Sequence, residues 1–266
     1  MATGLRVLDL FSGIGGFALG LERAGMETVA FCERDGYACR VLRKEWPAVP
    51  IFEDVRTLTA RRLKSHGITP NVICGGFPCQ DVSNAGKGRG LDGERSGLWR
   101  EYARLIREVR PRYAIVENVA ALRSRGLDRV LGDLAALGYD AEWHCIPAAD
   151  VGAPHLRDRI WIVAYPHGDR GRVELRLEAP RGGDLADRVE LGAEVVSLRP
   201  RALWAPAGAL QGAASPRICR VDDGLPHHVD RLRCLGNSVV PQVVELIGRA
   251  VAAHQAAGDA REKTAA

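Results

Sequence analysis

Short apolar runs alternate along the first 165 residues with stretches in which apolar residues recur at helical spacing. The apolar runs predict strands, and the amphipathic stretches predict helices. Strands separated by helices of this length predict a parallel sheet covered by helices on both faces. The expected strands are 6–10, 28–32, 50–53, 71–75, 112–117, 141–146 and 159–164, and the expected helices are 17–24, 37–46, 97–109 and 127–137.

The alternation stops after Tyr165, where the chain becomes rich in Gly, Pro and charged residues. This change predicts a small insert or a second domain. An apolar helix is expected again at 239–252, because Pro241 suits a first turn. The expected organisation is a main domain at 1–165, an insert at 166–216, a C-terminal segment at 217–255 that returns to the main domain, and a disordered tail at 256–266.

Composition narrows the class of protein. Apolar residues make up 46% of the 266-residue chain, which suffices for an ordinary core, and no apolar run is long enough to span a membrane. The N-terminus leads straight into a strand, so no signal peptide is expected. The seven cysteines include no Cys-x-x-Cys pair, which argues against a disulfide framework or zinc site and favours a cytoplasmic setting. The net charge of +4 permits nucleic-acid binding without requiring it.

A glycine-rich turn, Asp9-Leu-Phe-Ser-Gly-Ile-Gly-Gly16, joins the first strand to the first helix. Such glycines let a ligand approach the backbone, but the orders typical of nicotinamide and nucleoside triphosphate sites are missing. Glu33 and Asp54 end the next two strands. Either acid alone could be a helix cap or a solvated loop acid, whereas groups at three successive strand ends favour one shared ligand.

A thiol follows the strand that ends in Gly75-Gly-Phe-Pro-Cys-Gln80. Pro78 fixes its own φ and keeps Phe77 out of the helical region, so the chain turns sharply before Cys79. Glu117 ends the apolar run at 112–117. A thiol and a carboxyl group at the ends of two buried strands suggest covalent catalysis with an acid partner.

These segments, in this order, resemble the DNA (cytosine-5)-methyltransferase family over about residues 5–165 and 217–252. The matching segments are Asp9 to Gly16, Glu33, Asp54, Gly76 to Gln80, Arg95-Ser-Gly-Leu98, Glu117-Asn-Val119, Arg157-Asp-Arg159 and Gly236-Asn-Ser-Val-Val-Pro241. The resemblance implies an α/β class I S-adenosylmethionine-dependent methyltransferase fold, Rossmann-like and mostly parallel, with 166–216 as a small target-recognition insert. It also implies that the last segment folds back beside the glycine-rich turn.

The resemblance further implies a DNA (cytosine-5)-methyltransferase that transfers a methyl group from S-adenosylmethionine to carbon 5 of a flipped-out cytosine, through a covalent adduct on Cys79. The implied catalytic residues are Cys79, Glu117, Arg157 and Arg159. The implied cofactor-binding residues are Phe11, Ser12, Gly13, Gly15, Glu33, Asp54, Phe77, Asn237 and Ser238. No metal is implied, and the implied partners of a monomer are double-stranded DNA and a companion restriction endonuclease.

The stretch 83–97 directly follows the nucleophile and contains five glycines with Lys87, Arg89 and Arg95. It predicts a mobile basic loop that closes over the DNA backbone, the alternative being an ordinary surface loop. His155 and Arg34 depart from the family pattern, which usually has Gln and often an aromatic residue there. The short insert is either a minimal recognition domain or a degraded one.

Three other functions are consistent with parts of the sequence. One is the same chemistry on tRNA, although the Cys-Phe-Thr sequence of the RNA-acting relative is missing. Another is DNA binding without catalysis, against which the intact Cys79, Glu117 and Arg159 argue. A nicotinamide oxidoreductase leaves Pro78-Cys79-Gln80 and Glu117 unexplained.

Overall fold

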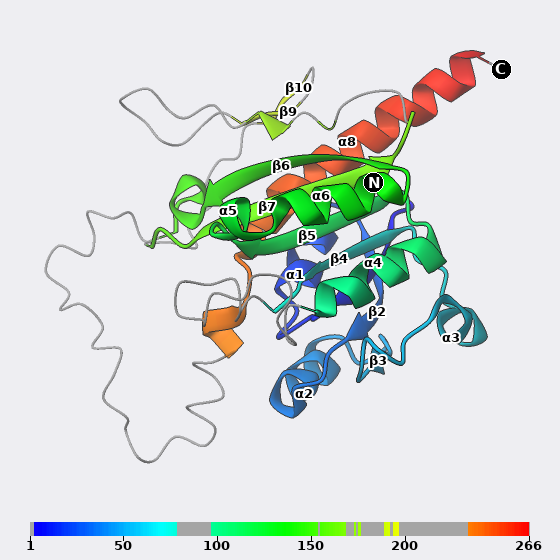
Figure 1. Cartoon of the computed structure of the whole chain (residues 1–266), viewed down its shortest axis with the longest axis vertical. Coiled ribbons are helices and arrows are strands. Elements are labelled where there is room, and N and C mark those ends of the chain that lie inside the picture. The colour runs from blue at the N-terminus through cyan, green and yellow to red at the C-terminus, as the bar shows by residue number, and fades with distance from the viewer. Residues whose placement is uncertain are drawn as a thin grey trace, which may run out of the picture.

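The computed structural model describes residues 3–78, 97–153, 155–168, 173, 175–176, 189–191, 194–196 and 234–265. A seven-stranded sheet in the order β3-β2-β1-β4-β5-β7-β6 forms its centre (Figure 1). Its strands are β1 (Arg6–Leu10), β2 (Glu27–Cys32), β3 (Ile51–Phe52), β4 (Val72–Gly76), β5 (Tyr113–Val119), β6 (Tyr139–Pro147) and β7 (Asp158–Pro166). The helices are α1 (Gly16–Arg23), α2 (Gly36–Glu45), α3 (Ala60–Ser65), α4 (Leu98–Val109), α5 (Leu122–Arg125), α6 (Leu127–Ala136), the 3₁₀ helix η2 (Ala148–Val151) and α8 (Pro241–Ala265).

The sheet is parallel from β3 to β5, as the alternating pattern predicts, and antiparallel at its other edge. There β7 lies between β5 and β6 and runs opposite to both. The connection from Pro147 to Asp158 contains only η2, and it is too short for the crossover that a parallel return needs. The mostly parallel α/β fold expected from the sequence is confirmed.

Two apolar clusters cover the two faces of the sheet. On one face, residues of β1, β4 and β5 pack against α3, α4 and α6, with Trp99 and Tyr102 fully buried. On the other face, alternate residues of the same strands pack against α1 and α8. Gly20 and Gly248 let these two helices approach closely, because a β-carbon at either position would contact the opposite helix. Strands β1, β4 and β5 are therefore covered on both faces.

The C-terminal helix is longer than expected. We expected residues 256–266 to be disordered, whereas α8 instead continues to Ala265. Alanine-rich sequence favours helix here, and Gln255 donates a hydrogen bond of 2.7 Å to Asp259, which also lies 3.8 Å from Arg112. Two short helices, α3 and α5, were not expected, because neither is long enough to show a period.

Three short strands, β8 (Leu175–Arg176), β9 (Val189–Leu191) and β10 (Glu194–Val196), form a separate antiparallel sheet in the expected insert. The rest of 166–216 lies almost entirely outside the described residues, as do the whole of 79–96 and His227-His228. Within the described ranges, no helix has the length and apolar character needed to cross a membrane.

Candidate active site

The glycine-rich turn lies between β1 and α1 and is held by its own hydrogen bonds. The Ser12 hydroxyl donates to the Asp9 carbonyl at 2.7 Å and accepts from the Cys32 amide at 3.3 Å. Gly15 has a φ of 87°, and a β-carbon there would overlap the Trp46 ring. Only glycine meets both demands. A β-carbon on Gly13, by contrast, would meet nothing within 4 Å, so that side of the turn is open.

Glu33 directly follows β2 and holds the turn from the other side. Its Oε2 accepts a hydrogen bond of 2.7 Å from the Gly13 amide, and its Oε1 accepts from the amides of Arg34 and Asp35 at 2.7 Å each. The cap of α2 is Asp35, whose carboxylate accepts from the amides of Tyr37 and Ala38. Glu33 is therefore not the helix cap that it could have been, and its carboxylate faces the turn.

Asp54 follows β3 in the loop that leads to α3. Its carboxylate accepts hydrogen bonds from the Arg56 side chain, at 2.7–3.1 Å, and from the Arg56 amide at 3.0 Å. These bonds lower the pKa of Asp54 to about 2, so the group is an anion at neutral pH. Asp54 also lines an open pocket of about 410 Å³, together with Ile51, Glu53, Thr57 and Arg62.

Glu117 lies near the end of β5, directly across from Gly76 of β4. A β-carbon on Gly76 would overlap its Oε2 atom, so glycine leaves the space that the carboxyl group occupies. Oε1 lies 2.9 Å from Nε of Arg159. Burial raises the pKa of Glu117 to about 7, although Arg159 and Arg157 act in the opposite direction. The group is therefore close to half-protonated at neutral pH, which suits a proton donor.

The chain that leads to Cys79 is fixed at its last described residues. Asn118 donates a hydrogen bond of 3.0 Å from Nδ2 to the carbonyl of Phe77. The Phe77 ring is buried and packs on Trp99 with 5.5 Å between ring centroids. Phe77, expected to bind the cofactor, thus has its ring in the core. Cys79 itself lies outside the described residues.

Arg157 and Arg159, both expected to be catalytic, have different surroundings. Arg159 contacts Glu117, whereas Arg157 donates from Nη1 to the Gly236 carbonyl at 2.8 Å and from Nη2 to the Ser238 carbonyl at 2.5 Å. Arg157 also has a positive φ of 31°. The structure therefore places its guanidinium against the C-terminal segment, as well as near enough to Glu117 to lower its pKa.

The segment before α8 lies beside the glycine-rich turn, as the resemblance implies. A β-carbon on Gly16 would lie 2.9 Å from Oγ of Ser238 and 2.9 Å from a methyl carbon of Val239. Asn237 is exposed, as are Arg34 and His155 at the positions that depart from the family pattern.

The structure brings the turn Phe11–Gly15, Glu33 and Ser238 together, and it separately pairs Glu117 with Arg159 beside β4. Sequence reasoning missed two contributors to this arrangement, Asn118 and Gly76. The signal for Gly76 was present in the paired glycines before Phe77, and that for Asn118 in its position beside Glu117.

Comparison with known proteins gives one consistent result. A model of the family described as C-5 cytosine-specific DNA methylase matches residues 5–181. The Type II methyltransferase M2.BsuMI of Bacillus subtilis is 37% identical over 168 residues, covering 60% of this chain and 42% of that protein. The Type II methyltransferase M.HhaI of Haemophilus parahaemolyticus is 34% identical over 167 residues, covering 61% of this chain and 50% of that protein. The matched part of the chain thus spans half the length of these relatives or less.

The fold has a counterpart that covers nearly the whole chain. The methyltransferase EhMeth of Entamoeba histolytica superposes with a TM-score of 0.64, covering 92% of this chain and 97% of that one, at 15% identity. At that identity the likeness concerns the fold alone.

Proposed function

Because this chain belongs to the C-5 cytosine-specific DNA methylase family, we propose that it transfers a methyl group to carbon 5 of cytosine in double-stranded DNA. One observation carries the proposal. The buried Glu117, held by Arg159 and with its pKa raised to about 7, lies next to the strand whose continuation reaches Cys79. A thiol beside a carboxyl group that can hold a proton is the pairing that addition to a cytosine ring requires.

The reaction begins with the protein's own thiol. Carbon 5 of cytosine is a weak nucleophile until a group adds to carbon 6, and the Cys79 thiolate makes that addition. Glu117 donates a proton or hydrogen bond to ring nitrogen 3 and neutralises the negative charge that develops there. Arg159 holds Glu117 in place, and its role in the proposal is to bind the base oxygen. After methylation, carbon 5 loses its proton to solvent, the bond between carbon 6 and the Cys79 sulfur breaks, and the thiolate leaves as the aromatic ring is restored.

The side chains around the glycine-rich turn fit S-adenosylmethionine, the methyl donor of this family. The open side of Gly13 lets the ligand approach the backbone. The carboxylate of Glu33 suits the ribose hydroxyls of an adenosine, and the anionic Asp54 suits its adenine amino group. Phe11, Ser12, Gly15, Asn237 and Ser238 complete the proposed site. When bound there, S-adenosylmethionine supplies the methyl group.

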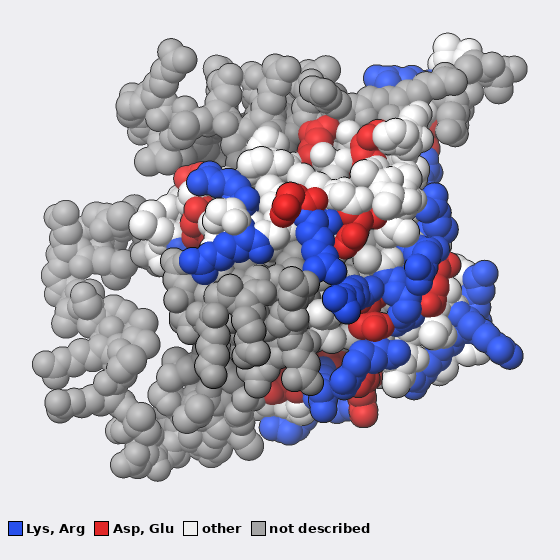
Figure 2. Space-filling model, viewed as in Figure 1, with Lys and Arg blue, Asp and Glu red and all other residues white. Residues whose placement is uncertain are grey.

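The target base must leave the duplex, because carbon 6 is inaccessible within the stack, and flipping costs roughly a few kcal/mol. Electrostatic attraction to phosphates offsets part of this cost. Figure 2 shows Lys and Arg side chains over α5, where Arg123 and Arg125 are exposed, and again over α4. We propose that the α5 side of this face, next to Glu117 in the chain, contacts the DNA backbone. A companion restriction endonuclease is the partner that the Type II relatives suggest.

The test maps 5-methylcytosine at base resolution in the DNA of cells that express this chain, beside cells that express Cys79→Ala. Methylation at a short recurrent sequence, absent with the variant, supports the proposal. Methylation that persists with Cys79→Ala overturns the covalent mechanism. Unmethylated DNA together with methylated tRNA from the same cells overturns the DNA substrate, and absence from both overturns the proposed activity.

A further inference from the structure

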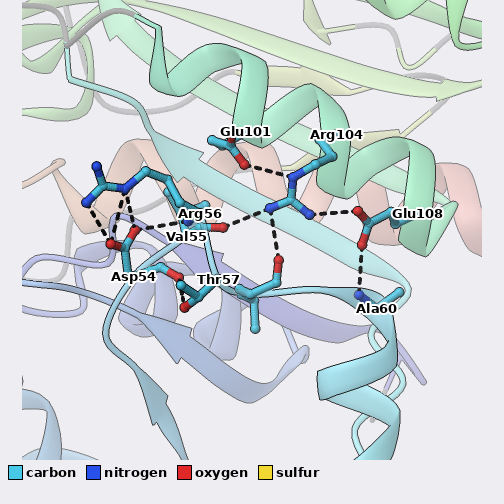
Figure 3. A network of polar contacts seen from close by, with 9 residues as sticks. Asp54, Val55, Arg56, Thr57, Ala60, Glu101, Arg104 and Glu108 are labelled. Carbon is cyan, nitrogen blue, oxygen red and sulfur yellow. Dashed lines mark hydrogen bonds and ion pairs between the residues drawn. The ribbon is translucent and has the colours of Figure 1, made fainter. Parts of the chain in front are cut away.

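Arg104 of α4 is the centre of a polar network on the loop that carries Asp54 (Figure 3). Its Nη2 donates to the carbonyls of Val55 and Leu58, at 2.9 Å each. Both carbonyls belong to the loop between β3 and α3, so one guanidinium nitrogen fixes two points of its backbone. Asp54 directly precedes the first of them.

Two glutamates of the same helix hold Arg104 in position. Nε donates to Glu101 at 2.7 Å, and Nη1 donates to Glu108 at 2.7 Å. Glu108 also accepts a hydrogen bond of 3.0 Å from the amide of Ala60, the first residue of α3. The Arg104 side chain is only 20% exposed. Four of its five donor N–H groups are thus used, and the network ties both ends of the loop to α4.

The loop is otherwise held by the burial of the Val55 and Leu58 side chains in the core, and Arg104 adds polar contacts to its backbone. Residues 53–59 belong to no strand or helix, and the amides of Thr57 and Leu58 both bond back to the Asp54 carbonyl at 3.1 Å. Arg56, a residue of the same loop, holds the Asp54 carboxylate. The position of that carboxylate therefore follows the loop backbone, which Arg104 holds at Val55 and Leu58.

We propose that Arg104 is a positioning residue for cofactor selection: it acts through Asp54, and it sets how well the site distinguishes an adenine amino group from other substituents. The inference rests on the proposed function, in which Asp54 accepts a hydrogen bond from that amino group. A misplaced acceptor loses this bond while contacts to the rest of the ligand remain.

The experiment measures binding by calorimetry, in the full chain, of S-adenosylhomocysteine and of its inosine counterpart, in which a carbonyl oxygen replaces the amino group. The variants are Arg104→Gln, Arg104→Lys, Asp54→Asn and the double variant Arg104→Gln/Asp54→Asn. Arg107→Gln is the matched control, since Arg107 lies on the same helix and is exposed. Thermal unfolding of every variant reports whether it is folded at the temperature of measurement.

We expect the wild type and Arg107→Gln to prefer the adenosine compound by about tenfold or more, the usual effect of one hydrogen bond to a charged acceptor. Arg104→Gln should reduce this preference several-fold, and the double variant should be no worse than Asp54→Asn, because the two residues act in series. Arg104→Lys keeps the charge beside Glu101 and Glu108, but its one nitrogen would have to serve two carboxylates and two carbonyls that three nitrogens of Arg104 share. An intermediate preference is therefore expected.

The outcomes separate the inference from the proposed function. If the wild type discriminates and Arg104→Gln discriminates equally, the positioning role of Arg104 is overturned while the proposed function stands. If both ligands weaken equally in Arg104→Gln, Arg104 supports the fold alone and the inference is again overturned. If the wild type binds neither compound, the cofactor site itself is wrong, and the inference is overturned with it.

Discussion

Gly76 lies directly across the sheet from Glu117, and a β-carbon at Gly76 would overlap the Oε2 atom of that carboxyl group. Gly76→Ala should therefore displace Glu117 from Arg159 and slow single-turnover methyl transfer by about 10²-fold or more, since correctly placed acid catalysis is worth ~10²–10⁴ in rate. Gly132→Ala is the control, because a β-carbon on that helical glycine would meet nothing within 4 Å. Equal rates for the two variants would show that Glu117 does not need the space left by the missing β-carbon at Gly76.

The raised pKa of Glu117 predicts that this residue destabilises the folded protein as pH rises. Because its pKa is about 7 in the folded protein and 4.5 ordinarily, the unfolded chain loses this proton first as pH rises. The free energy of unfolding should therefore fall, relative to Glu117→Gln, from about pH 4.5 to about pH 7, by up to about 3 kcal/mol. Denaturant unfolding of both proteins at pH 5 and pH 8 measures the difference. A constant difference would show that Glu117 has an ordinary pKa.

Asp9, in the core, should also make the stability of the protein depend on pH. It is completely buried, and burial raises its pKa well above the usual value, although the Cys74 thiol acts in the opposite direction. Asp9→Asn should stabilise the protein increasingly as pH rises above about 4. Each pKa unit of difference contributes about 1.4 kcal/mol, and each kcal/mol moves the unfolding midpoint by about 2–4 °C. In thermal scans from pH 4.5 to pH 8, the difference in unfolding midpoint between Asp9→Asn and wild type should increase with pH. A difference that decreases with pH would contradict a raised pKa of Asp9.

Replacing Arg157 should change cofactor affinity, whereas replacing Arg159 should change the rate of methyl transfer. Arg157 binds the carbonyls of Gly236 and Ser238, and Ser238 lies against Gly16 of the glycine-rich turn. Arg157→Ala should thus weaken S-adenosylhomocysteine binding about tenfold, the typical effect of losing a charged hydrogen bond. Arg159→Ala should instead lower the rate constant of methyl transfer with cofactor affinity within twofold of wild type. The reverse pattern would mean that Arg157, and not Arg159, serves the base.

Periodicity predicted the seven strands of the sheet and the longer helices, because buried strands and amphipathic helices leave a local signal. It could not place β7 between β5 and β6, since strand order depends on connection length and packing. The order of the motifs predicted the site residues, but it could not predict their burial or their contacts. The pKa of Glu117 depends on burial, and the contacts of Arg157 and Arg104 join segments far apart in the sequence, which no local pattern records.

The bond between Arg157 and Gly236 affects which part of the chain can vary in length and sequence. The chain leaves the sheet at Pro166, the end of β7, where Pro166 pairs with Tyr139 of β6. Gly236 is held by Arg157, so each border of the stretch between them is fixed by a residue outside it. Lengthening a loop whose ends are already held costs little free energy. Residues 167–233 should therefore tolerate changes of length and sequence while Glu117 and the glycine-rich turn keep their geometry.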